Sequence, residues 1–284
     1  GAVELSGEGN LEVGPHGGLF VVDARSGTVL HLDGRGEVTR VLGGAAAAEG
    51  CCQAPLDVAA TASGDLYVSD GVANRVWFVN RSTAPVTAHG QLIPPGEALP
   101  VAGRGGQGFS GDGGPAVDAQ FLAVRGVALG PEGSLYVADA DEHTVRRIDP
   151  AGTIHTAAGS GRPGFNGDAL KGPATTLNTP TDVTLDRCGN LLVVDSLNSR
   201  LRRVSTSSDP SCQPLPDVPT TRPDSGRRGV VLGVVAGFGV LGAAGAGLVV
   251  GRRRRAALRR GRGGASPRRR PSRRTGRRSP GRAE

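Results

Sequence analysis

Apolar and polar positions alternate in a pattern that occurs four times in the first 204 residues. Four segments align without gaps, and each holds an apolar stretch, a turn, a second apolar run, another turn and a third run: 10–32, 57–79, 126–148 and 182–204. The first turn contains a glycine in every unit: Gly17, Gly64, Gly133 and Gly189. Short apolar runs separated by tight turns predict antiparallel strands joined in sequence order. The second strands are expected at Leu19–Val22, Leu66–Ser69, Leu135–Ala138 and Leu191–Val194.

The spacing of these units indicates an all-β propeller. The leucine that opens the second strand recurs after 47, 69 and 56 residues, close to the roughly 40–50 residues of one propeller blade. An aspartate follows the second strand in every unit: Asp23, Asp70, Asp139 and Asp195. A carboxylate before a tight turn accepts hydrogen bonds from the backbone amides of that turn. We therefore interpret the four aspartates as repeated scaffold, with Arg75 and Arg200 as their expected partners.

A second repeat lies between the units and identifies a family resemblance. Residues 101–116 and 157–174 share the pattern G-x-G-x-x-G-F-x-G-D followed by G-P-A. Together with the GxLYVADxxNxRVRRI pattern of the units, these loops resemble NHL repeats over about residues 10–204. The first unit departs from the pattern, because Thr28 replaces an arginine and no such loop precedes it. The resemblance implies a β-propeller, commonly of six blades. Four blades are visible, so we expect two more before Gly1, which agrees with the absence of methionine.

The expected ligand site lies where the innermost strands begin, because these strands line the central channel of a propeller. The residues at that position are Asn10, Asp57, Gly126 and Asp182, with Arg125 adjacent. They could bind a cation, a sugar or a peptide end, or they could cap the loops. None of the five histidines has metal-ligand spacing, so we predict no metal and no cofactor. The G-x-G-x-x-G loops open no predicted helix, which argues against a nucleotide site.

The C-terminal part is predicted to anchor the chain in a membrane. After a Ser/Pro/Thr-rich linker over 205–229, residues 230–250 carry no charged or polar side chain. A helix of this length spans roughly 32 Å, which matches a hydrocarbon core of about 30 Å. Arg252–Arg255 follow at once, so the propeller is expected outside the cell and the basic, disordered tail 251–284 in the cytoplasm. The alternatives are a buried helix rich in Gly and Ala, or a cell-wall sorting signal that begins at Leu215.

Composition and charge support two different environments. Gly and Pro are abundant at 47 and 20 residues, which favours a turn-rich β fold, and the net charge is +7. The 15 arginines of 252–284 leave the rest of the chain acidic. The basic tail lies beside the predicted inner leaflet and could contact anionic lipid. It lacks aromatic residues, so no specific nucleic-acid binding is predicted. Arginine greatly outnumbers lysine, as in a bacterial gene of high GC content.

Four cysteines suggest disulfides in an oxidising compartment. Cys188 and Cys212 flank the last predicted hairpin and are candidates for one bond, whereas Cys51 and Cys52 pair either with each other or with nothing.

These features favour a membrane-anchored extracellular binding or scaffolding module for a protein, peptide or glycan. The resemblance also implies an alternative, a lyase- or lactonase-type enzyme with a metal held at the channel mouth by Asn10, Asp57 and Asp182. A third alternative is a sensor module of a larger receptor.

Overall fold

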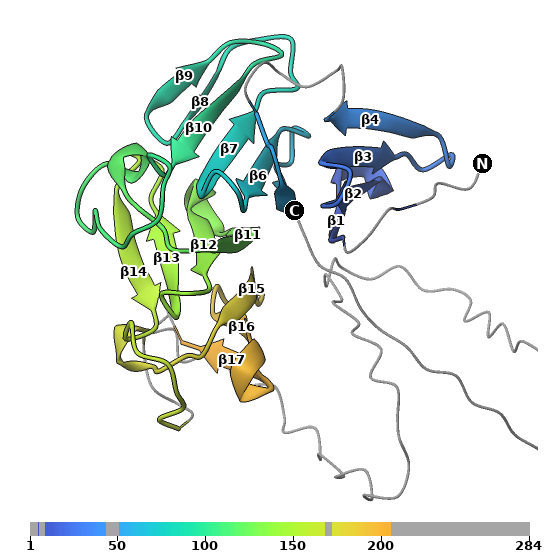
Figure 1. Cartoon of the computed structure of the whole chain (residues 1–284). Helices are drawn as coiled ribbons and strands as arrows, with labels where there is room; N and C mark the ends of the chain where they lie inside the picture. Colours follow the sequence, from blue (N-terminus) through green and yellow to red (C-terminus); the bar gives the residue numbers. More distant parts are fainter. Residues whose placement is uncertain (1–4, 6–8, 44–50, 168–171, 206–284) are drawn as a thin grey trace, which may run out of the picture. The chain divides into compact units, whose positions relative to one another are not determined.

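The computed structural model describes residues 5, 9–43, 51–167 and 172–205, and this part of the chain forms four larger antiparallel β-sheets in sequence order and one separate two-stranded sheet (Figure 1). We call the four larger sheets blades 1 to 4. This arrangement confirms the prediction of an all-β fold with four propeller blades. The predicted linker, membrane helix and basic tail lie outside the described residues.

Each blade is a meander in which consecutive strands pair with each other. Blade 1 contains β1 (Leu11–Val13), β2 (Leu19–Asp23), β3 (Thr28–Leu32) and β4 (Val38–Leu42). Blade 2 contains β5 (Pro55–Ala60), β6 (Leu66–Asp70), β7 (Arg75–Val79) and β10 (Ala98–Ala102). Blade 3 contains β11 (Val124–Leu129), β12 (Leu135–Asp139), β13 (Thr144–Ile148) and β14 (Ile154–Ala158). Blade 4 contains β15 (Pro180–Leu185), β16 (Leu191–Asp195) and β17 (Arg200–Val204).

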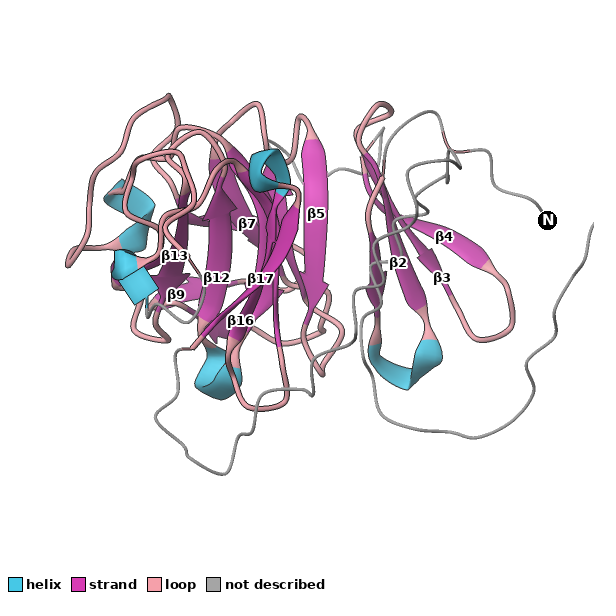
Figure 2. Cartoon of the chain, turned by 90° about the horizontal axis from the view of Figure 1, so that it is seen from below, coloured by secondary structure: helices cyan, strands magenta, loops and turns pink. Residues whose placement is uncertain are grey.

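A hairpin that the repeat pattern did not predict is inserted in blade 2. It consists of β8 (Val86–Ala88) and β9 (Gln91–Ile93), and it lies between β7 and β10 along the chain. Short 3₁₀ helices occupy loops between the strands (Figure 2): η1 (Pro15–Gly17), η3 (Ala116–Asp118), η4 (Pro131–Gly133), η5 (Gly172–Ala174) and η6 (Ser196–Asn198). None of the helices in the described part is long and apolar enough to cross a membrane.

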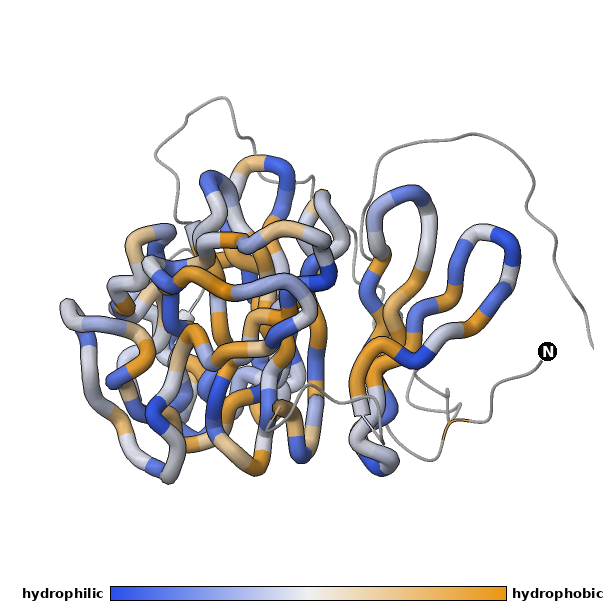
Figure 3. The backbone as a smooth tube through the Cα atoms, turned by 90° about the horizontal axis from the view of Figure 1, so that it is seen from above, coloured by the Kyte–Doolittle hydropathy of each residue, from blue (hydrophilic) through white to orange (hydrophobic). Residues whose placement is uncertain are grey.

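The hydrophobic core consists of layers between successive blades. In β12, Leu135 and Val137 pack with residues of blade 2, whereas Tyr136 and Ala138 pack with residues of blade 4. Successive side chains of a strand point to opposite faces of its sheet. Because both faces of the central blades are covered, their middle strands are nearly continuous apolar runs. Figure 3 shows this pattern as hydrophobic strands separated by hydrophilic turns.

The first strands of successive blades are neighbours. β1 contacts β5, β5 contacts β11, and β11 contacts β15. Residues at the start of these strands are therefore brought together although they are far apart in the sequence. This contact pattern agrees with the expectation that the first strand of each blade lies innermost.

Candidate functional site

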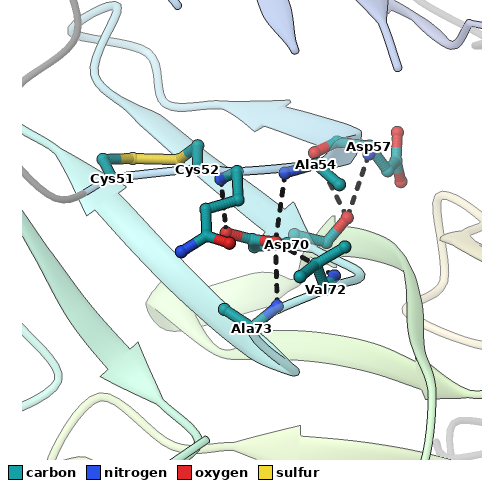
Figure 4. The surroundings of a disulfide bond; sticks show 9 residues. Cys51, Cys52, Ala54, Asp57, Asp70, Val72 and Ala73 are labelled. Carbon is teal, nitrogen blue, oxygen red and sulfur yellow. Dashed lines mark hydrogen bonds between the residues drawn. A yellow bond between two sulfur atoms is a disulfide. The ribbon is translucent and has the colours of Figure 1, made fainter. Parts of the chain in front are cut away.

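The aspartate that ends the second strand fastens the segment that enters its own blade. In blade 2, Asp70 accepts hydrogen bonds from the amides of Gln53 and Ala54 at 2.8 and 3.2 Å. It also accepts bonds from the amides of Val72 and Ala73 in the following turn, both at 3.1 Å (Figure 4). The Asp70 side chain is fully buried, and these four amide donors all belong to the blade in which Asp70 lies.

The same arrangement recurs in the next two blades. Asp139 accepts from the amides of Leu122 and Ala123, and Asp195 accepts from the amide of Asn178 at 2.7 Å. The amide donors lie 16 or 17 residues before the aspartate in blades 2, 3 and 4. In blade 1, Asp23 accepts from the Ser26 amide in the following turn. Through these contacts the repeated aspartates hold the backbone of their blades in place, which is a structural role.

The arginines in contact with this scaffold differ from those that the sequence suggested. Arg202, which is buried, lies 3.1 Å from the Asp195 carboxylate. Arg200 instead stacks on the ring of Phe165, with its guanidinium carbon 4.2 Å from the ring centroid. Arg75 donates to the carbonyl oxygen of Arg104 at 2.8 Å. The described ion pairs and hydrogen bonds therefore do not pair Arg75 or Arg200 with a strand-end aspartate.

In blade 3 a buried arginine joins the strand to the preceding loop. Arg146 forms an ion pair with Asp112 of the 101–116 loop. The ring centroid of Phe109 in that loop lies 4.6 Å from the Arg146 guanidinium carbon. Asp112 also accepts a bond from the Thr156 hydroxyl at 2.7 Å. The conspicuous Gly-Phe-Ser-Gly-Asp motif thus serves to bind the loop to its own blade.

Cys51 and Cys52 are joined to each other by a disulfide, which resolves the alternative left open by the sequence. Both cysteines are buried in the apolar layer between blades 1 and 2, and the bonds to Asp70 begin at the next residue, Gln53 (Figure 4). The candidate bond between Cys188 and Cys212 stays a prediction, because Cys212 lies outside the described residues.

The predicted mouth residues come together at the starts of the first strands. Asp57 of β5 accepts a 2.6 Å hydrogen bond from the Asn10 side-chain amide, which comes from blade 1. Its other carboxylate oxygen accepts a 2.7 Å bond from the Val127 amide of blade 3. The Asp57 carboxyl therefore joins three blades. The prediction that these residues converge is correct for Asn10 and Asp57, and their main contacts are with each other and with the backbone.

Blade 3 presents no side chain at the equivalent position, because Gly126 stands there. A Cβ atom on Gly126 would lie 2.5 Å from a carboxylate oxygen of Asp182, too close for any other residue to fit without movement. Asp182 itself accepts a 2.8 Å bond from the amide of Val183. Glycine is thus required where blade 3 meets blade 4.

Burial raises the pKa values of three carboxyls in this region, and repulsion from Asp182 raises two of them further. Burial raises the pKa of Asp57 well above its usual range, and the nearby Asp182 carboxyl raises it further. Burial also raises the pKa of Asp182 itself. The pKa of Glu12 is raised by burial and, to a lesser extent, by Asp182. Sequence reasoning missed Glu12, although its place between the apolar residues Leu11 and Val13 in β1 marks it as unusual.

A pocket of about 270 Å³ opens at this mouth. The four blades all contribute to its lining: Gly9, Asn10, Ala24, Leu56, Asp57, Arg125, Gly126 and Thr181. Arg125 is exposed, and no ion pair or hydrogen bond of its side chain occurs among the described residues. The pocket therefore combines one available guanidinium with carboxyl and amide groups that are already hydrogen-bonded to protein.

A metal site at the mouth requires several ligands close together. Within the described ranges, no group of three or more His, Cys, Asp and Glu side chains is arranged to hold a metal ion. The mouth carboxyls Asp57 and Asp182 instead face backbone amides, whose N–H groups repel a cation.

Comparison with known proteins identifies the family. A family model described as the teneurin NHL domain matches residues 4–196. The chain belongs to the teneurin NHL domain family. The match includes Asn10, Asp57, Arg125 and Asp182, so the mouth lies within the family domain, and the expected NHL resemblance is confirmed.

Individual relatives share only part of their length with this teneurin NHL domain. Mouse teneurin-3 is 30% identical over 143 residues, which are 46% of this chain and 5% of that protein. The Arabidopsis thaliana protein SUPPRESSOR OF QUENCHING 1, chloroplastic, is 28% identical over 97 residues, 34% of this chain and 9% of that protein. The chain thus spans less than a tenth of either relative.

A solved structure shares the fold of the teneurin NHL domain. An auxiliary nutrient binding protein from Bacteroides ovatus superposes with a TM-score of 0.51 at 19% identity, covering 69% of this chain and 47% of that one. At this identity the likeness supports the propeller fold alone.

Proposed function

We propose that this chain is a membrane-anchored, extracellular binding module whose ligand docks at the propeller mouth. The observation that carries the proposal is the pocket of about 270 Å³ to which the four blades contribute and on which Arg125 has no protein partner among the described residues. An exposed guanidinium beside a pocket is available to a ligand without first breaking an internal ion pair.

The side chains of the pocket favour binding over bond breaking. The Asp57 carboxyl accepts hydrogen bonds from Asn10, Val58 and Val127, so its lone pairs are directed at protein donors. A general base needs a lone pair within hydrogen-bond reach of the substrate proton. Asp57 in this arrangement shapes the wall of the pocket and joins the blades, which supports a binding role.

The chemistry of Arg125 points to a ligand that carries a carboxylate. Guanidinium is planar, always charged and matched to the two oxygens of a carboxylate, so it selects such groups over neutral ones. Asn10 and Thr181 supply further polar groups around the same pocket. A peptide or glycan with an exposed carboxylate fits these features.

The proposed location rests on the sequence and on one covalent bond. Residues 230–250 are apolar throughout and are followed by Arg252–Arg255, the pattern of a single span with a cytoplasmic basic end. The bond between Cys51 and Cys52 agrees with an oxidising compartment. Protease treatment of intact cells should remove the propeller and leave an epitope placed after Glu284 intact. Protection of the propeller would contradict this topology.

The binding proposal is tested with the full chain on arrays of acidic and neutral glycans and peptides. We expect binding to carboxylate-bearing probes, with a loss of at least about tenfold in affinity for Arg125→Ala. The matched control is Arg104→Ala, which removes another exposed arginine outside the pocket and should bind as the parent does. Binding that is insensitive to Arg125→Ala, or probes that are chemically altered by the protein, would contradict the proposal.

A further inference from the structure

The inserted hairpin of blade 2 reaches across to blade 3. Its tip is the two-residue turn His89–Gly90, which lies against the turn that joins β13 to β14. A Cβ atom on Gly90 would lie 2.9 Å from the carbonyl oxygen of Ala151, and one on Gly152 would collide with the carbonyl oxygen of His89. The two turns therefore meet backbone to backbone, with no room for a side chain at either glycine.

The base of the hairpin is fixed to its own blade by separate bonds. The fully buried side-chain amide of Asn80 donates to the carbonyl oxygen of Ile93 at 2.9 Å. The side-chain amide of Gln91 donates to the carbonyl oxygen of Pro100 at 2.8 Å. Ala88 and Ile93 are also buried in the apolar layer between blades 2 and 3. The base therefore stays on blade 2 whether or not the tip contacts blade 3.

The side chain of His89 connects the tip to both blades. Its Nδ1 atom lies 2.7 Å from the carbonyl oxygen of Asp149 in blade 3. Because a carbonyl oxygen only accepts, Nδ1 carries the proton, and Nε2 of the neutral ring is a bare acceptor. The ring also packs edge-on against Tyr67 of β6, with 5.5 Å between the ring centroids. His89 is buried in this position.

The geometry of the turn does not explain a histidine at its first position. The φ angles of His89 and Gly90 are +46° and +79°, as in a type I′ turn, where both central residues have positive φ. Asn or Asp followed by Gly is the preferred pair in such a turn, because these side chains tolerate the left-handed region. The contacts of the imidazole ring with Asp149 and Tyr67 therefore account for this residue better than the backbone does.

The second ring nitrogen makes the contact sensitive to protonation. Nε2 of His89 is buried and has no hydrogen-bond partner in the described part of the chain. A proton on Nε2 would create a buried cation with an unpaired N–H group, which costs far more than an unpaired neutral acceptor. Burial accordingly lowers the pKa of His89, although the Asp149 carbonyl and carboxylate oppose this effect. Acid therefore favours an open tip, in which Nε2 reaches water.

The titratable groups around His89 come from blade 3 and from β6, because the strands of the hairpin contain no charged residue. The Asp149 carboxylate attracts a protonated His89, but it is itself held by the Thr153 amide at 2.8 Å and partly offset by Arg147. Tyr67 stays uncharged, since burial raises its pKa to about 12. In the described structure none of these groups bonds to Nε2.

We propose that His89 is an acid-sensitive latch, whose protonation releases the tip of the inserted hairpin from blade 3. Asn80 and Gln91 keep the base on blade 2, so the opening is local. Because the pKa of His89 is lowered from 6.5, the closed contact is fully stable above pH 6.5 and weakens as the pH falls below that value. The hairpin contributes no residue to the mouth pocket, so the latch is separate from the proposed ligand site.

The test is hydrogen exchange of the full chain in mild detergent at pH 7.5 and pH 5.0, with rates corrected for the intrinsic pH dependence of amide exchange. We expect exchange over residues 86–93 to become at least about threefold faster at pH 5.0, while β12 in the core does not become faster. His89→Asn keeps a residue that suits the turn and cannot titrate, so its hairpin should exchange equally at both pH values. The matched control is His155→Asn, which removes an exposed histidine of β14 and should respond as the parent does.

A second measurement follows the proton directly. Nuclear magnetic resonance of histidine-labelled protein resolves five imidazoles, and the signal lost in His89→Asn or His89→Gln identifies His89. Its titration midpoint should lie below pH 6.5 and coincide with the midpoint of hairpin opening. Equal hairpin exchange at both pH values in the parent, a response that persists without His89, a response that extends to β12, or two different midpoints would each overturn the latch. Ligand binding through Arg125 is measured separately and is unaffected by these outcomes.

Discussion

Asp57 and Asp70 of blade 2 are both buried carboxylates, yet Asp70 stabilises a single blade and Asp57 stabilises the contacts between blades. Asp70 accepts amide hydrogen bonds only from its own blade, from the entering segment and the following turn. Asp57 accepts bonds from Asn10 of blade 1 and Val127 of blade 3. One carboxylate completes a blade, whereas the other joins blades.

The difference explains how each residue is distributed along the repeats. A strand-end aspartate occurs in all four units, and in blades 2, 3 and 4 it fastens the entering segment of its own blade. The mouth position varies among Asn10, Asp57, Gly126 and Asp182, because neighbouring blades share the available space there. Where a side chain contacts only its own blade, the same residue type recurs in each repeat. Where it contacts neighbouring blades, the residue type varies with the neighbours.

The largest expected effect is that of Asp70→Ala. Four backbone amides would lose a charged acceptor in a buried site, so we expect the free energy of unfolding to fall by roughly 3–5 kcal/mol. Urea titration followed by circular dichroism measures the change. Asp141→Ala removes an exposed carboxylate of the next blade and should alter stability by less than about 0.5 kcal/mol. Equal losses for the two variants would remove the distinction between scaffold and surface aspartates.

The strand-end aspartate of blade 3 should also make stability depend on pH. Burial raises the pKa of Asp139 to about 6, against 3.8 for its ordinary value. The native state then binds the proton more tightly than the unfolded state, so this group stabilises the fold below pH 4 and loses that contribution as pH rises through 6. The shift corresponds to about 3 kcal/mol.

Asp139→Asn isolates this contribution because asparagine does not titrate. The free energy of unfolding of the parent, relative to that of the variant, should fall by about 2 kcal/mol between pH 4 and pH 7, because the unfolded chain is already partly ionised at pH 4. Urea titrations at pH 4, 5.5 and 7 measure it. Parallel pH curves for the two proteins would mean that Asp139 is ionised as readily in the native state as in the unfolded chain.

The strands were predictable because the repeat supplies four versions of one pattern. Each predicted second strand is present, and the strand extends one residue further to include the aspartate. The choice of arginine was not predictable, because Arg200 lies directly opposite Asp195 and Arg202 lies diagonally. Both positions are within reach of a long side chain. The Phe165 ring lies against both guanidinium groups, and Arg202 alone also donates to the carbonyl oxygens of Thr176 and Gly167, whose positions depend on how the loop folds.

The mouth was predictable in its composition but not in its energetics. The alignment places Asn10 and Asp57 at equivalent positions, and the structure brings them to 2.6 Å. No alignment shows that Asp57 also accepts the Val127 amide, since that bond depends on how blades 2 and 3 dock. The inserted hairpin at Val86–Ile93 falls outside the repeat and had no pattern to reveal it. The six-bladed ring, the bacterial origin and the membrane anchor stay predictions.

Asp57→Ala should lower the free energy of unfolding less than Asp70→Ala does. Its effect should appear at the junction between blades and not within blade 2. We expect the free energy of unfolding to fall by about 2 kcal/mol, because the Val127 amide loses its acceptor at the junction of two blades. Hydrogen exchange should become faster at Val127 while the Ala54 amide, held by Asp70, stays protected. Faster exchange at both amides would show that the two carboxylates act as one unit.

Asn10→Ala should have the smallest effect, since it removes one hydrogen bond to Asp57 at a partly buried position. We expect a loss of about 1 kcal/mol in the free energy of unfolding. The loss should shrink to near zero when Asp57→Ala is already present, because the partner of the lost bond is then gone. A double-mutant cycle by urea titration measures this coupling. Additive losses would mean that Asn10 contributes through packing, so that Asp57 would join two blades and not three.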